Sequence, residues 1–94
     1  MFDRILKTMR DLVRARQYVM TIHADEEMFE DGLRIRDVEN VILTGKIVDR
    51  QRDRHTGEWK YLVVGRSLAG FEAVVVAQIG VPRKLVIITV YAND

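Results

Sequence analysis

The spacing of apolar residues along the chain changes once, from a helical period in the first half to a strand period in the second. Residues 2–16 carry apolar side chains at positions i, i+1, i+4, i+7 and i+8, with Asp3 placed to act as an N-cap. This apolar stripe consists of Ile5, Leu6, Met9, Leu12 and Val13. The pattern predicts one amphipathic helix, followed by an extended link over residues 17–22 where apolar and polar residues alternate.

Two shorter helices are predicted between Thr21 and Gly45. The first begins around His23, has acidic residues in its opening turn and reaches Gly32, which suits a left-handed C-terminal cap. The second carries Val38, Val41 and Ile42 at helical spacing, and Gly45 closes it.

After Gly45 the period becomes two, and four strands are predicted with turns of hairpin length between them. Their ranges are 46–50 or 46–52, 59–66, 71–79 and 85–91. Because the helices come first and the strands follow, we expect one α+β domain over residues 1–94. In it, three helices pack on one face of a four-stranded antiparallel meander.

The alternation within each strand predicts which side chains stay on the uncovered face of this sheet. In the last strand, the all-aliphatic set Val86, Ile88 and Val90 is expected to lie beneath the helices. The uncovered face is then expected to gather cationic and hydroxyl groups. They are Arg50, Lys60, Arg66, Thr89 and Tyr91.

Composition and charge narrow the class of protein. The chain has no cysteine, and no apolar run approaches the roughly 20 residues of a membrane span, so we expect a cytoplasmic protein without membrane contact. The net charge is only +1. Residues 1–16 are nevertheless basic, residues 21–45 hold seven acidic and two basic groups, and residues 46–60 are basic again. We therefore expect a basic side and an acidic side.

Cationic groups fixed on a sheet beside a tyrosine suit a phosphodiester, whose transition state gains negative charge. RNA supplies its own 2′-hydroxyl nucleophile, so the protein needs a proton acceptor, a proton donor and positive charge, but no metal or cofactor. Of the side chains present, His23 suits the acid or base role best. A lone histidine at a helix start is also typical of a structural hydrogen-bond donor, and Tyr91 of an aromatic at the core edge. His23, Asp25, Glu26 and His55 lack a recognised metal-ligand spacing.

Several short motifs resemble one known family over nearly the whole chain. They are His23-Ala24, Gly32-Leu33, Asp37-Val38 before Gly45, Tyr61-Leu62-Val63-Val64-Gly65 and Ile88-Thr89-Val90-Tyr91. The chain resembles domain-of-unknown-function family 4258, which is similar in layout to MqsR-type and RelE-type toxins. The resemblance implies a toxin-like fold and metal-independent cleavage of mRNA. It also implies silencing by an antitoxin that is often a zinc-binding, DNA-binding protein.

The same resemblance implies a set of site residues. His23 and Tyr91 come from the motif, and Lys60, Tyr61 and Arg66 from sheet positions where such toxins keep cleavage residues. RNA contacts are expected at Arg50, Arg52, Arg54 and Thr89. Members of the family commonly read H-A-x-x-R-M-x-x-R-G, whereas this chain has Glu27 and Asp31 at the two arginine positions.

Two hypotheses follow from these observations. The first is an endoribonuclease that cleaves single-stranded mRNA as the toxin of a type II toxin-antitoxin pair, with a zinc-finger or helix-turn-helix antitoxin as its partner. The second is a non-catalytic protein-interaction module of the same fold, which the acidic residues 21–45 favour. A weak homodimer through an apolar edge of residues 71–79 or 85–91 is a further possibility.

Overall fold

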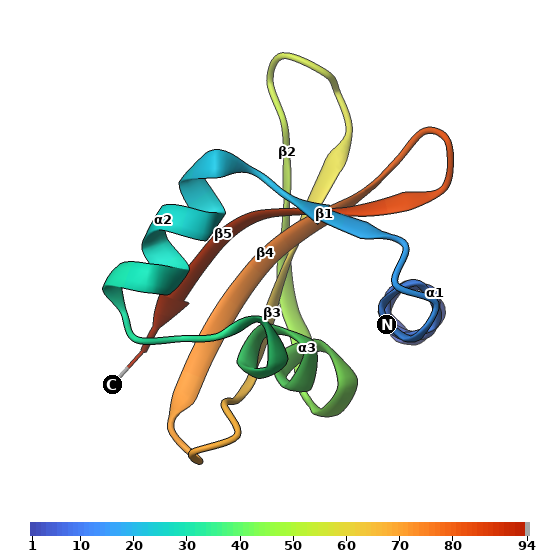
Figure 1. Cartoon of the computed structure of the whole chain (residues 1–94). Helices are drawn as coiled ribbons and strands as arrows, with labels where there is room; N and C mark the ends of the chain where they lie inside the picture. The colour runs from blue at the N-terminus through green and yellow to red at the C-terminus, as the bar shows by residue number, and fades with distance from the viewer. Residues whose placement is uncertain (94) are drawn as a thin grey trace.

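The computed structural model describes residues 1–93 and contains three helices and five strands in that range (Figure 1). The helices are α1 (Asp3–Arg14), α2 (Ile22–Glu30) and α3 (Ile35–Thr44). The strands are β1 (Tyr18–Met20), β2 (Lys46–Arg52), β3 (Trp59–Arg66), β4 (Glu72–Gly80) and β5 (Lys84–Ala92). The fold is therefore α+β with an open sheet, and no helix within residues 1–93 is long and apolar enough to cross a membrane.

The sheet has the order β1-β5-β4-β3-β2, in which β1 runs parallel to β5 and every other neighbouring pair is antiparallel. The prediction of four antiparallel strands is correct for β2 to β5 but misses β1. That strand pairs Tyr18, Val19 and Met20 with Leu85, Val86 and Ile87, which lie more than 60 residues later in the sequence. Three alternating residues cannot be distinguished in sequence from an extended link, so nothing local predicts this pairing.

The predicted helices are present, with small differences at their ends. Phe2 is the N-cap of α1, and its side chain accepts no capping hydrogen bond. Asp3 is the first helical residue and not the cap. The helix ends at Arg14 because Arg16 adopts a left-handed φ of 56° before β1. Gly32 follows α2 with a φ of +70°, as its predicted capping role requires.

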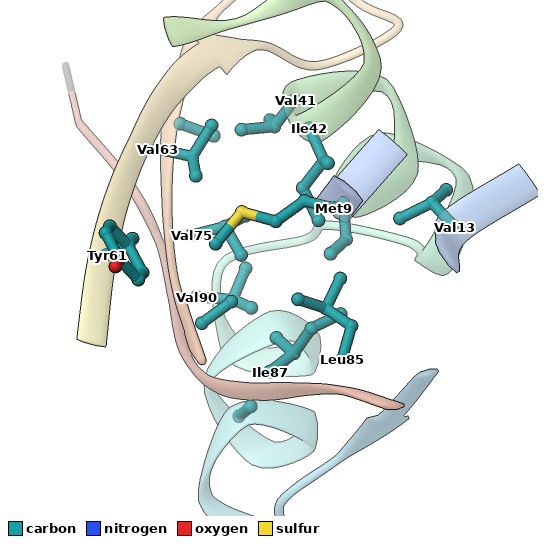
Figure 2. Packing of buried hydrophobic residues seen from close by; sticks show 14 of the residues in the cluster. Met9, Val13, Val41, Ile42, Tyr61, Val63, Val75, Leu85, Ile87 and Val90 are labelled. Carbon is teal, nitrogen blue, oxygen red and sulfur yellow. The ribbon is translucent and has the colours of Figure 1, made fainter. Parts of the chain in front are cut away.

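The core lies between one face of the sheet and the helices, and Figure 2 shows how its side chains meet. Met9 of α1 points toward Val75 of β4, while Ile42 of α3 lies above the strands. Both side chains are fully buried. The sheet contributes Tyr61, Val63, Ala73, Val75, Ala77, Leu85, Ile87 and Val90 to this cluster.

A bulge in β5 decides which side chains of that strand face the core. Thr89 pairs with Val76, but the next pairing along is Ile87 with Ala77, so Ile88 is an extra residue. Leu85, Ile87 and Val90 are consequently buried. The expectation that Val86, Ile88 and Val90 share the covered face is therefore wrong for Val86 and Ile88. Strict alternation fails where the register shifts by one residue.

Candidate functional site

The open face of the sheet, which no helix covers, carries most of the polar groups expected there. Lys60 and Arg66 alternate with the buried residues of β3, and Thr89 and Tyr91 lie on the same side of the sheet. Lys46, Val64, Val74 and Tyr91 form one row across the four strands β2 to β5. Lys60 lies four residues before Val64, so it is about 14 Å along β3 from that row. The face thus places Lys46 in the row of Tyr91 and leaves Lys60 farther away.

Two residues expected at this site lie elsewhere. Tyr61 faces the helices, is 8% exposed and stacks edge-to-face on Phe2 with ring centroids 6.0 Å apart. Arg50 pairs with Tyr61, and directly opposed side chains share a face. The cause is a bulge at Val48, between the Ile47 and Asp49 pairings, which turns Arg50 away from the open face. The placement of Arg50 on the open face is therefore wrong, and Tyr61 is a core residue.

The β2–β3 hairpin gathers the arginines for which RNA contacts were expected. The guanidinium carbons of Arg50 and Arg52 lie 3.9 Å and 4.4 Å from the ring centroid of Trp59. Arg54 is exposed in the turn. The hairpin extends beyond the rest of the sheet in Figure 1. These cations therefore lie together, but apart from Thr89 on the open face.

The turn of this hairpin is held by hydrogen bonds among its own residues. Asp53 Oδ1 accepts hydrogen bonds from the backbone N–H groups of His55 and Thr56, which lower the pKa of the Asp53 carboxyl. No helix supplies a contact to His55 among the hydrogen bonds of the described residues. The hairpin thus presents charge on a locally fixed turn.

Helix α2 lies along β5 and is joined to it by hydrogen bonds (Figure 1). Thr21 donates from its backbone N–H to Ile87 O and from Oγ1 to Ile88 O, at 2.9 Å and 3.0 Å. Farther along, Glu27 accepts from the N–H of Val90 at 3.4 Å, and Asp31 accepts from Ala92 at 2.7 Å. Strand β1 covers β5 only over Leu85–Ile87, so these carboxylates satisfy edge N–H groups that it leaves unpaired. We call this region the α2–β5 margin.

This margin gives a physical role to Glu27 and Asp31, the two acidic residues of the motif that begins at His23. A carboxylate accepts a backbone hydrogen bond, whereas an arginine can only donate. Sequence reasoning missed Glu27 and Asp31 as partners of β5. The signal was present, because His23, Glu27 and Asp31 are spaced by four residues and so lie along one line of the helix.

His23 lies at the start of the α2–β5 margin. Its Nε2 is 2.9 Å from Glu27 Oε1, and its side chain is 66% exposed. The Glu27 carboxylate therefore faces Nε2, and the two groups form an ion pair when the imidazole is protonated. Nδ1, on the other side of the ring, is the nitrogen that can accept a proton from a substrate. The period of the helix places His23 and Glu27 on the flank of α2 away from Met28, which packs against the core. Glu27 on that flank also accepts a hydrogen bond from the backbone of Val90, which precedes Tyr91 in β5.

Away from the α2–β5 margin, a hydrogen bond between Tyr18 and Glu39 changes the pKa of a tyrosine. Tyr18 of β1 donates to Glu39 of α3 at 2.5 Å, and burial together with this hydrogen bond raises the pKa of Tyr18 to about 12. Residues 1–93 hold no group of three or more His, Cys, Asp or Glu side chains that could bind a metal ion.

These features define a small α+β domain with an open sheet face, bordered by a histidine–carboxylate pair. The family model described as "Domain of unknown function (DUF4258)" matches residues 20–92, so the chain belongs to this family. The match includes the α2–β5 margin and the whole antiparallel part of the sheet, while α1 lies outside it. No curated protein and no solved structure matches the chain.

Proposed function

We propose that this protein is a toxin-like, metal-independent endoribonuclease that cleaves single-stranded mRNA in the cytoplasm. The observation that carries the proposal is the approach of His23 Nε2 to within 2.9 Å of Glu27 Oε1. Glu27 is itself hydrogen-bonded to the backbone of Val90, one residue before Tyr91. A carboxylate beside an imidazole is an arrangement that orients a general base.

The reaction uses groups that this chain and RNA supply. His23 Nδ1 accepts the proton of a ribose 2′-hydroxyl, and the 2′-oxygen forms a bond to the adjacent phosphorus. The bond from phosphorus to the 5′-oxygen breaks, and Tyr91 donates its phenolic proton to that oxygen. The products are a 2′,3′-cyclic phosphate and a free 5′-hydroxyl. Glu27 keeps Nε2 protonated and offsets the positive charge that forms on the imidazole.

Positive charge for the phosphates comes from two places. Lys46, Lys60 and Arg66 lie on the open face, and the arginines of the β2–β3 hairpin extend the basic surface. Contacts of this kind release counterions, so added salt weakens RNA binding. In this proposal Lys60 and Arg66 hold the RNA strand, and Tyr61 takes no part because it is buried.

The partner in this proposal is an antitoxin encoded beside the toxin, of the zinc-finger or helix-turn-helix type. Its support is the resemblance to MqsR-type and RelE-type toxins in the order of helices and strands. The pair would form a type II toxin-antitoxin system in which the antitoxin blocks RNA cleavage.

The test compares the two histidines of the chain. A single-stranded RNA labelled at its 5′ end is incubated with the protein in EDTA. The products are separated by electrophoresis, and the labelled fragment is tested for a 2′,3′-cyclic phosphate at its end. His23→Ala is expected to cleave at least about 100-fold more slowly, because it lacks the base. His55→Ala, in the exposed hairpin turn, is the matched control and is expected to stay within about threefold of the wild type.

Two results would contradict the proposal. One is a wild-type protein that leaves the RNA intact under all salt conditions. The other is an equal loss of rate in both histidine variants, with unchanged circular dichroism spectra, which would remove His23 from the mechanism.

A non-catalytic protein-interaction module is the second candidate, and one observation favours it. The centre of the open face is aliphatic, and its partly exposed side chains are Leu62, Val64, Val76 and Val86. Such a patch is typical of protein contacts, including a weak homodimer. This candidate predicts intact RNA together with a stable complex, which Val76→Lys disrupts and His23→Ala leaves unchanged.

A further inference from the structure

Two large apolar side chains of α2 lie in solvent. Ile22 is 80% exposed and Phe29 is 84% exposed. They are seven residues apart, so they lie on the same side of the helix, about 10 Å from each other along its axis. The helix packs against β5 through its other side, where Ala24 is fully buried. The exposed pair therefore contributes nothing to the core.

A groove lies beside Phe29, and side chains of a partner can enter it. It has a volume of about 350 Å³, and Met28 and Leu33 form its apolar floor. Three carboxylates line it, from Asp25, Glu26 and Glu30. They are separate from Glu27 and Asp31, which accept hydrogen bonds from β5. Helix α2 contains no lysine or arginine to neutralise them.

We propose that this groove, together with Ile22 and Phe29, docks a cationic amphipathic helix of another protein. Apolar side chains of that helix at positions i, i+3 or i+4, and i+7 would cover Ile22 and Phe29 and enter the groove. Its lysine or arginine side chains would meet Asp25, Glu26 and Glu30, which gives charge complementarity. The apolar part of this surface is distinct from the RNA face, because Ile22 and Phe29 lie roughly 100° and 120° around the axis of α2 from His23.

The same observations disfavour two other occupants. A second copy of this chain could offer the basic surface of α1, but the exposed positions of that helix are all charged and provide no apolar side chain. A membrane surface would accept Ile22 and Phe29. The carboxylates around them would then face anionic lipid headgroups, which is unfavourable.

A peptide selection tests both the surface and the chemistry of its partner. A random library of 16-residue peptides on phage is selected on the wild-type protein, with counter-selection on the Phe29→Ser variant. We expect enriched peptides with a net positive charge and apolar residues at helical spacing. A synthetic copy of an enriched peptide is expected to bind Phe29→Ser at least tenfold more weakly than the wild type, as measured by fluorescence anisotropy.

The control variant is Val81→Ser, because Val81 is 94% exposed but lies in the β4–β5 turn. Binding to it should equal binding to the wild type, and Glu26→Lys should weaken binding. RNA cleavage is expected to be unchanged in Phe29→Ser, so the two proposals can fail separately. The docking proposal is overturned if the enriched peptides are neutral or acidic. It is also overturned if Val81→Ser binds the peptide as weakly as Phe29→Ser does, or if no peptide is enriched on the wild type over Phe29→Ser. Sedimentation showing a wild-type dimer that Phe29→Ser abolishes would overturn it in favour of a second copy.

Discussion

Helices α2 and α3 are of similar length, yet they are attached to the sheet in different ways. Helix α3 buries Val38, Val41 and Ile42, whereas α2 buries only Ala24 among its own residues. Helix α2 is instead held by hydrogen bonds to β5, in which Thr21 donates and the carboxylates of Glu27 and Asp31 accept. Helix α3 is therefore held by buried side chains as well as by hydrogen bonds such as that of Asn40 to Arg66 O, whereas α2 relies mainly on polar contacts. Attachment of the second kind leaves the outer side chains of α2 available for other contacts.

The largest difference in stability is expected when an isoleucine is truncated on each of the two helices. Ile42→Ala is expected to reduce the free energy of unfolding by about 2–5 kcal/mol, because it opens a cavity in the core. Ile22→Ala should change it by less than about 0.5 kcal/mol, since that side chain is in solvent. Urea denaturation measures both. Equal losses would show that α2 packs as tightly as α3.

A smaller loss is expected where α3 meets β3. A Cβ at Gly45 would lie 2.4 Å from the carbonyl oxygens of Val41 and Val64. Gly45→Ala should therefore cost about 1–3 kcal/mol of stability through overpacking. Gly80→Ala is the control, because a Cβ there meets its nearest atom at 3.5 Å. If both variants have the same urea midpoint, the close approach does not constrain α3.

Removing the cap of α2 should act locally. Thr21 Oγ1 accepts from Ala24 N at 3.1 Å and donates to Ile88 O, so Thr21→Ala loses both contacts. We expect a loss of about 1 kcal/mol and faster hydrogen exchange of the α2 amides than of the α3 amides. Equally increased exchange in both helices would contradict independent attachment.

The last effect concerns the contact between β1 and α3 and is seen only at high pH. The pKa of Tyr18 is raised to about 12, so the folded protein holds this proton more tightly than the unfolded chain does. The resulting stabilisation is complete below pH 10 and is lost as the pH rises to about 12. Between pH 10 and 12, the melting temperature of Tyr18→Phe should therefore fall less than that of the wild type. Thermal unfolding at each pH measures this difference. Parallel curves would show that the Tyr18–Glu39 contact carries no such linkage.

Much of the fold could be predicted from the sequence because its patterns are long and regular. The apolar stripe of α1 and the alternation in β3 each extend over several turns or pairs. Strand β1 could not be predicted, since its partner lies more than 60 residues away. The bulges at Val48 and Ile88 were also hidden, because one extra residue leaves the composition of a strand unchanged while reversing its faces.

The same limit applies to the candidate site. His23 and Tyr91 could be singled out by residue type and motif. The structure places His23 beside Glu27, and Tyr91 opposite Val74 on the open face. Arg50 was misplaced by the bulge in β2. Glu27 could be noticed only by considering which groups satisfy the uncovered edge of β5, and that edge is a property of the tertiary structure.

The central claim is that Glu27 holds His23 for chemistry, and one pair of variants tests it most directly. Glu27 and Asp31 both accept from β5, but Glu27 also contacts the imidazole. Single-turnover cleavage of single-stranded RNA should be at least about tenfold slower in Glu27→Gln, with an unchanged half-saturating protein concentration. Asp31→Asn should cleave at the wild-type rate. Equal rates in the two variants, or weaker RNA binding without a slower cleavage step in Glu27→Gln, would contradict the account.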